Sequence, residues 1–422
     1  MTNFRRLILI FTFLVSLEIS TRAQTVNNNE RTDFICEYPF IIQDSPSLLF
    51  TMRQVNQDYL SGYRLLSMVL SDNLKPTYNY LIQSAGFVLF FGTMTHEEAH
   101  RSVLNTKNIG SISRPFLLSE RNGYVFGVTD IQLKNIRDTD FPTYAHLYTA
   151  GFESDYMLNH HEESLLSFGD ERFKNIAVEY LLRKVMLVQY FLIGFIHYDI
   201  DETEETDELK RDIVGNDIYG VVRHWYRPAM EFKRYTLYND LTAEEKSFLK
   251  RMGFRSLLNF VNPNLIGIRN FPISSQLSIN TGLGYTLAPF GDFIDENLWI
   301  NYNHKFKISA YFRQFQNKNN WYPATGLGID NFVIVQRLSA NIRFHTWKQP
   351  ENLSFAETKS FFGGAIDSGV KYIVFTSEKE GFKSMSVDLG LLCKTKGFLP
   401  EELVLGKQMN FRIGITFSFD KP

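Results

Sequence analysis

The sequence predicts an α+β protein in which an N-terminal all-helical domain precedes a C-terminal antiparallel β-barrel of about eight strands. Between residues 45 and 260, apolar residues recur at the 3.6-residue period of helices. After residue 262 they alternate with polar residues at the two-residue period of strands. We therefore expect a signal peptide at 1–23, a flexible leader at 24–44, a helical domain at 45–260 and a barrel at 261–422.

The N-terminus indicates export. Arg5 and Arg6 precede an apolar segment at 7–17, and Thr21-Arg22-Ala23 offers small residues for cleavage. The leader that follows is polar and shows little periodicity. The formal net charge of −2, without a long basic run, argues against a nucleic-acid partner. Two cysteines at opposite ends of the mature chain and 38 Phe residues are typical of a bacterial cell-envelope protein.

The helical region contains six predicted helices, at 48–70, 76–104, 144–166, 171–198, 213–226 and 241–260, the last with Thr242 as N-cap. We interpret 105–143 as a loop-rich insertion with a possible strand at 124–128, and 201–212 as a solvated acidic loop. The apolar stretches near 79–104 and 177–198 also suit an inner-membrane protease. That alternative leaves the alternating C-terminal region unexplained.

The C-terminal alternation favours a membrane barrel over a soluble sheet. In the last segment Met409, Phe411 and Ile413 alternate with Asn410, Arg412 and Gly414, and similar patterns occur at 277–287, 332–344 and 385–391. A polar face of Gly, Ser, Asn, Thr and Arg suits a narrow lumen, and the apolar face suits lipid. Aromatic residues near predicted strand ends suit a bilayer interface: Trp299, Trp321, Tyr322 and Trp347. A barrel this narrow places the helical domain at one rim.

The segment from Gly92 to His100 contains the motif H-E-x-x-H. On a helix, His96 and His100 lie on one face, so both imidazoles can reach a single metal ion. Glu97 can hold a metal-bound water, accept its proton and pass the proton to a leaving amine. The preceding apolar run would fix this helix firmly in a core. The motif therefore predicts a zinc hydrolase. The alternative is that its His and Glu residues are ordinary surface residues at a helix end.

A zinc hydrolase needs a third protein ligand, and Gly151-Phe152-Glu153-Ser154-Asp155 follows about fifty residues later. In this arrangement the chain resembles the gluzincin metallopeptidases, over roughly residues 76–166. The resemblance implies that His96, His100 and Glu153 are ligands, Glu97 the general base and Asp155 a group that orients a histidine. Glu98-Ala99 inside the motif departs from the family pattern, and Asp155 or Glu163 remain alternative ligands.

Two further polar groups are candidates. His160-His161-Glu162-Glu163 can bind metal, but adjacent histidines point to different helix faces, so we expect a solvated surface. His224, Tyr226 or Arg227 could stabilise an oxyanion. The alternative is that the aromatic residues of this segment belong to the core.

Together these features predict an exported, outer-membrane-associated zinc metallopeptidase. It would use Zn²⁺ to hydrolyse peptide bonds in a peptide or protein substrate, and would contact membrane lipid. The alternative is a non-enzymatic outer-membrane barrel protein whose helical domain serves in binding or assembly.

Overall fold

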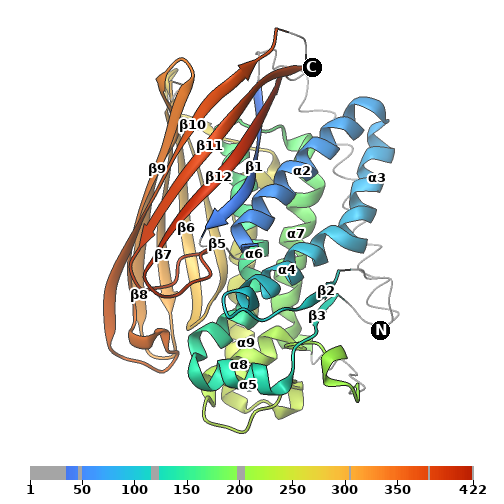
Figure 1. Cartoon of the computed structure of the whole chain (residues 1–422), viewed down its shortest axis with the longest axis vertical. Helices are drawn as coiled ribbons and strands as arrows, with labels where there is room; N and C mark the ends of the chain where they lie inside the picture. The colour runs from blue at the N-terminus through green and yellow to red at the C-terminus, as the bar shows by residue number, and fades with distance from the viewer. Residues whose placement is uncertain are drawn as a thin grey trace.

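The computed structural model describes residues 35–45, 50–115, 123–196, 205–303, 306–378 and 381–420. The predicted signal peptide at 1–23 and the leader up to residue 34 lie outside the described residues. The described chain combines helices with one large antiparallel sheet, as the predicted fold class requires (Figure 1).

Each of the six predicted helices is present with shifted ends. The α-helices of the described residues are α2 (Met52–Asn73), α3 (Pro76–Gly86), α4 (Gly92–Asn105), α5 (Asp130–Thr139), α6 (Phe141–Phe168), α7 (Phe173–Ile196), α8 (Asp217–Tyr226) and α9 (Ala243–Ser256). A π-helical turn, η1 (Phe87–Phe91), joins α3 to α4, and a 3-10 turn, η4 (Leu257–Phe260), follows α9. Helix α5 was not predicted, because it lies in the segment interpreted as a loop-rich insertion.

Local capping explains where these helices begin and end. Helix α2 starts at Thr51, whose side chain accepts from the Gln54 amide, rather than near residue 48 as predicted. Helix α9 starts at Thr242 with a capping box to Glu245, as the sequence predicted. Helix α6 ends at Gly169, whose φ of 75° is a left-handed conformation that glycine adopts readily.

The sheet has ten strands in the order β1-β12-β11-β10-β9-β8-β7-β6-β5-β4. Their bounds are β1 (Ile35–Ser45), β4 (Phe271–Pro272), β5 (Leu277–Ala288), β6 (Gly291–Tyr302), β7 (Phe306–Gln316), β8 (Trp321–Val335), β9 (Leu338–Pro350), β10 (Ser360–Thr376), β11 (Phe382–Lys394) and β12 (Gln408–Asp420). A separate ribbon pairs β2 (Ile112–Arg114) with β3 (Tyr124–Phe126), near the predicted strand at 124–128.

The predicted flexible leader is wrong for residues 35–44. Instead of remaining irregular, this segment forms β1 and pairs antiparallel with β12 along its length, from Ile35 opposite Asp420 to Ser45 opposite Phe411. Cys36 and Tyr38 of β1 are fully buried. Pairing with a strand 366 to 385 residues later in the chain supplies the order that the local sequence does not indicate.

The predicted closed barrel and the helical domain at its rim are also wrong. Strands β1 and β4 end the order of the sheet and do not pair with each other. The sheet curves around the helices, which lie along its open side in Figure 1. Helix α6 contacts the sheet directly, since Tyr156 donates to Asp295 of β6 at 2.6 Å and Thr286 of β5 donates to the Phe152 carbonyl. The helices therefore fill the concave side of the sheet.

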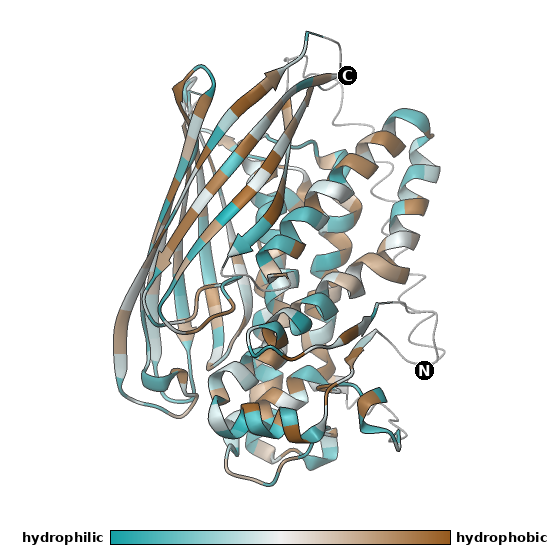
Figure 2. Cartoon of the chain, viewed as in Figure 1, coloured by the Kyte–Doolittle hydropathy of each residue, from teal (hydrophilic) through white to brown (hydrophobic). Residues whose placement is uncertain are grey.

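On β10, β11 and β12 the outward side chains are mainly apolar and most of the inward ones are polar, whereas the strands from β5 to β9 also bury apolar residues such as Leu287, Phe293 and Trp347. Figure 2 shows hydrophilic and hydrophobic residues alternating along β10, β11 and β12. Exposed apolar residues on these strands are Phe362, Ile366, Val370, Leu389, Met409, Phe411 and Ile413. Buried polar residues facing the helices are Asp367, Ser386, Lys394, Asn410, Thr416 and Ser418. This is the reverse of the pattern in a water-soluble sheet.

The aromatic residues at strand ends differ in part from the prediction. Trp321 is exposed, but Trp299, Tyr322 and Trp347 are buried, because their positions in the two-residue period point inward. At the ends of the strands away from Trp321 and Trp347, Phe306 stacks on Phe332 and Phe375 on Phe382.

Within the described part of the chain, no helix is both long and apolar enough to cross a membrane.

Candidate metal centre

Helix α4 carries both motif histidines on its buried face. Their ring centroids lie 5.0 Å apart, and His96 is 8% and His100 1% exposed. The π-helical turn before α4 is fixed by aromatic contacts of Phe91 with Tyr59 and Tyr63 of α2. The rigid support expected from the apolar run is therefore present.

Hydrogen bonds from helix α6 orient both imidazole rings. His96 Nδ1 lies 2.8 Å from Asp155 Oδ2, and His100 Nδ1 lies 2.5 Å from the Leu147 carbonyl oxygen. Binding the Nδ1 atoms in this way leaves both Nε2 atoms available to a metal ion. The contact between Asp155 and a motif histidine is the one that the resemblance implied.

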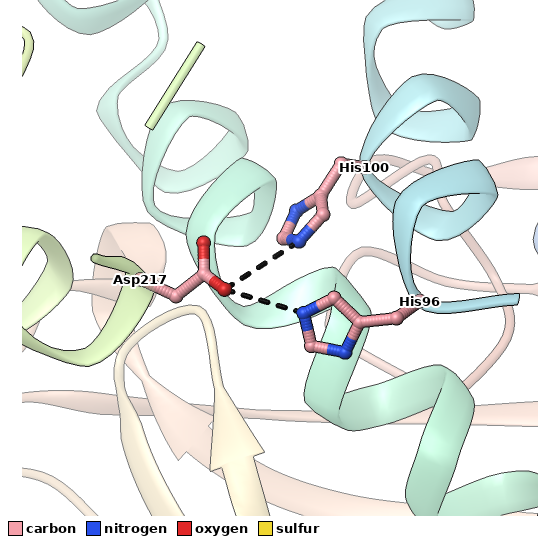
Figure 3. Close-up of side chains that lie close together, drawn as sticks. All are labelled: His96, His100 and Asp217. Atoms are coloured by element: carbon pink, nitrogen blue, oxygen red, sulfur yellow. Dashed lines mark hydrogen bonds and ion pairs between the residues drawn. The ribbon is translucent and has the colours of Figure 1, made fainter. Parts of the chain in front are cut away.

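Asp217 brings a carboxylate to the same point, as Figure 3 shows. Its Oδ2 atom lies 3.2 Å from His96 Nε2 and 3.7 Å from His100 Nε2. Asp217 opens helix α8, where the side chain of the N-cap Asn216 accepts from the Tyr219 amide at 3.1 Å. The helix start thus fixes the carboxylate against α4.

The three donor atoms could hold a metal ion. They all lie within 4.8 Å of one another and are buried. Two imidazole nitrogens and one carboxylate oxygen form a ligand set typical of catalytic zinc, which keeps a fourth position open. Asp217 Oδ1 is buried and has no hydrogen-bond partner among the described residues, so it too is available to a cation.

Electrostatics also favour a cation here. Burial raises the pKa of Asp217, but the charges and hydrogen bonds of the two histidines outweigh it and hold that pKa well below its usual range. Burial lowers the pKa of His96, but Asp155 and Asp217 outweigh that effect and raise it. The carboxylates therefore attract protons to this point, and a metal ion would take the place of those protons.

Glu97 is adjacent to the cluster and 8% exposed. Burial raises the pKa of Glu97 to about 7, although the charges of His100 and His96 oppose this effect. The next residue, Glu98, has a different role, because its carboxylate pairs with Arg101 at 2.6 Å on the same helix.

Besides Asp217, two residues of this site were not predicted. Tyr190 of α7 places its hydroxyl 3.1 Å from Asp217 Oδ2 and stacks its ring on His96 at 5.9 Å. Arg183, also on α7 and fully buried, donates to Asp155 Oδ1 at 2.5 Å and to Thr95 Oγ1 at 2.9 Å. Both lie in a helix that the sequence shows mainly as apolar.

The structure does not bring Glu153 to the histidines, and Asp217 takes its predicted place. Glu153 Oε2 lies 2.7 Å from His146 Nε2, and Oε1 accepts from the Glu401 amide at 2.6 Å. Residues 153 and 155 are about 200° apart around α6, so only Asp155 faces α4. The alternative ligand Glu163 pairs with Lys184 at 2.6 Å.

The predicted oxyanion groups lie elsewhere. His224 is two turns beyond Asp217 on α8, with Nε2 3.3 Å from the Tyr144 hydroxyl, and burial lowers its pKa to about 3. Tyr226 packs against Phe248 and Phe355. Arg227 binds Glu245 at 2.7 Å. None belongs to the metal-binding group of the described residues.

The expectation of a solvated surface at 160–163 is wrong. Glu162 and Glu163 are buried, and the His160 ring lies 5.8 Å from that of Trp299 on β6. His161 Nε2 lies 3.0 Å from Glu401 Oε2. The sheet covers this part of α6, so the two glutamates are interior and the two histidines are only partly exposed.

Comparison with known proteins finds no matching family, no matching curated protein and no matching solved structure.

Proposed function

We propose that this protein is a zinc-dependent metallopeptidase bound to the outer membrane. The convergence of His96, His100 and Asp217, with Glu97 beside them, carries the proposal. Two Nε2 atoms and a carboxylate meet from helices α4 and α8, which are 120 residues apart in the sequence. Such convergence of buried donors is costly unless a cation or protons compensate it.

The residues have distinct roles in peptide hydrolysis. His96, His100 and Asp217 would hold zinc, which when bound supplies the positive charge that polarises a carbonyl and lowers the pKa of water. Glu97 takes a proton from the attacking water and passes it to the leaving amine. Tyr190, whose hydroxyl donates to Asp217 at 3.1 Å, could turn that hydroxyl towards the developing oxyanion.

The membrane location is supported by the sheet. On β10, β11 and β12 its outward side chains are mainly apolar, whereas most of the inward ones are polar. The outward residues from Met409 to Phe419 cover ten residue steps, which at a strand tilt of about 40° corresponds to roughly 25 Å of height. This is the height of the apolar band of outer-membrane strands.

The burial of the metal centre favours a second candidate function. His96 and Glu97 are each only 8% exposed, which leaves little room for a peptide chain. A non-enzymatic membrane protein, with a structural metal and a helical binding or assembly module, accounts for this burial.

One pair of variants separates the two functions. Glu97→Gln removes the proton carrier and keeps the metal ligands, whereas Glu98→Gln changes the adjacent carboxylate, which pairs with Arg101. We expect Glu97→Gln to retain zinc but to lose hydrolysis of fluorescein-labelled casein by about 100-fold or more. Glu98→Gln should remain active. Equal activity of Glu97→Gln and the wild type would refute the peptidase mechanism.

A further inference from the structure

The free edge of β1 is satisfied by side chains of helix α2. The Ile41 amide donates to Asp58 at 2.7 Å, and the Ile41 carbonyl accepts from Gln54 at 3.1 Å. Two further edge carbonyls are bound in the same way, Pro39 by Gln57 and Ser61, and Glu37 by Arg64. Helix α2 therefore takes the place of the next strand.

On the other side of the sheet, the part of β5 that the two-residue strand β4 does not pair is bound by the segment after α9. Asn259 of η4 donates to the Tyr285 carbonyl at 2.9 Å and accepts from the Tyr285 amide at 3.0 Å. The Val261 carbonyl accepts from the Leu283 amide at 2.9 Å. The hydrogen bonds at these two edges thus satisfy backbone groups that an open sheet leaves unpaired. A protein surface that contacts lipid hydrocarbon requires its backbone polar groups to be paired in this way.

Helix α3 has the same reversed polarity as the sheet. Asn79, Gln83 and Ser84 are buried, while Leu81 and Ile82 are about half exposed. The buried side chains bind each other, since Gln83 donates to Asn79 at 2.6 Å. No charged residue occurs from position 78 to 91, and such a stretch is about 21 Å long as a helix. A water-facing helix would show the opposite arrangement.

Helix α2, which borders β1, also has apolar side chains on its exposed face. Leu66 and Val69 are exposed, whereas Arg64 and Ser67 are buried. The sheet and the α2–α3 pair lie on different sides of the molecule in Figure 1. A rigid partner, such as a second copy of the chain, covers a patch that faces one direction. Fluid hydrocarbon covers apolar surfaces that face several directions.

We propose that α2 and α3 are part of the lipid-facing wall and complete, together with the open sheet, a mixed wall of strands and helices. This inference rests on the membrane location proposed above. Because α4 follows α3 directly through η1, the metal centre would lie at the end of a lipid-facing helix.

Spin labels test the inference in the full chain reconstituted in vesicles of phosphatidylethanolamine and phosphatidylglycerol. Single cysteines at Leu81 on α3, Leu389 on β11 and Lys210 as the aqueous reference are labelled in a Cys393→Ser background. Cys36 is fully buried and should not react. Frequent collisions of the spin label with oxygen indicate that it lies in hydrocarbon, and frequent collisions with a water-soluble nickel chelate indicate that it lies in water.

We expect the ratio of oxygen to nickel collisions at Leu81→Cys to equal that at Leu389→Cys and to exceed that at Lys210→Cys several-fold. A lipid signal at position 389 with water, or protection from both probes, at position 81 would overturn the inference and leave the membrane location intact. Water at both positions would overturn both proposals.

Discussion

Substitution of Gly151 by Ala should destroy the metal centre while leaving the fold in place. Gly151 lies on α6 directly beneath the His96 ring, and a Cβ there would lie 2.3 Å from Nε2 and 2.4 Å from Cε1. Ordinary contact begins near 3.4 Å, so the ring has to retreat by about 1 Å. Asp155 holds its Nδ1 atom and Tyr190 stacks on its face, which prevents a simple sideways shift.

The size of the effect follows from the tolerance of metal sites. Ligand distances vary by only about 0.2 Å, so a 1 Å displacement removes His96 as a ligand. Zinc affinity should fall by at least about 100-fold, since even changes to residues behind the ligands cost about 10–100-fold. Overpacking should cost about 1–3 kcal/mol of stability, partly offset by the ~1 kcal/mol helix preference of Ala over Gly.

The assay is zinc titration with a competing chelator, with thermal unfolding measured on the same samples. Gly62→Ala is the matched control, because a Cβ at position 62 of α2 meets no atom within 4 Å. This control should bind zinc as the wild type does and gain up to about 1 kcal/mol of stability. If Gly151→Ala bound zinc as tightly as Gly62→Ala, the assignment of His96 as a ligand would be refuted.

Three further outcomes are expected. Asp155→Asn should weaken zinc binding by about 10–100-fold in the same titration, and unchanged affinity would show that Asp155 does not orient His96. Burial raises the pKa of Glu401, but the charge of His161 and their hydrogen bond outweigh it and lower the pKa from 4.5 to about 2. The lowered pKa stabilises the fold above pH 4.5, and this contribution is lost as the pH falls through 2. Glu401→Gln should therefore remove on the order of 3 kcal/mol at pH 7 and flatten the pH dependence of urea unfolding in that range; an unchanged profile would contradict it. Ile413→Lys on the outward face of β12 should cost about 2–4 kcal/mol for unfolding from vesicles, whereas a water-facing position would tolerate lysine without loss.

Features that depend on local periodicity were predicted correctly from the sequence. The helix from residue 144 to 166 and the alternation from Met409 to Phe419 both appear as expected, because each is specified by nearby residues. The contact of Asp155 with a motif histidine was implied by the family resemblance and not by periodicity, and it depends on how α6 packs against α4. The closure of the sheet is not local, since pairing of β1 with β12 and the seam with α2 depend on contacts across the whole chain.

The third ligand could not be predicted from spacing. Glu153 has the suitable distance in sequence from the motif, but the orientation of α6 turns it towards His146. Asp217 lies 117 residues after His100, and the only local signal is the helix-start pair Asn216-Asp217. Such a signal occurs at many helix starts, so the convergence of α4 and α8 is visible only in three dimensions.

The zinc content of the purified mature protein tests the central claim most directly. Elemental analysis should find about one zinc per chain in the wild type and in Glu153→Gln, and none in Asp217→Ala. Zinc retained by Asp217→Ala but lost from Glu153→Gln, or no zinc in the wild type, would contradict the assignment of His96, His100 and Asp217 as the metal centre.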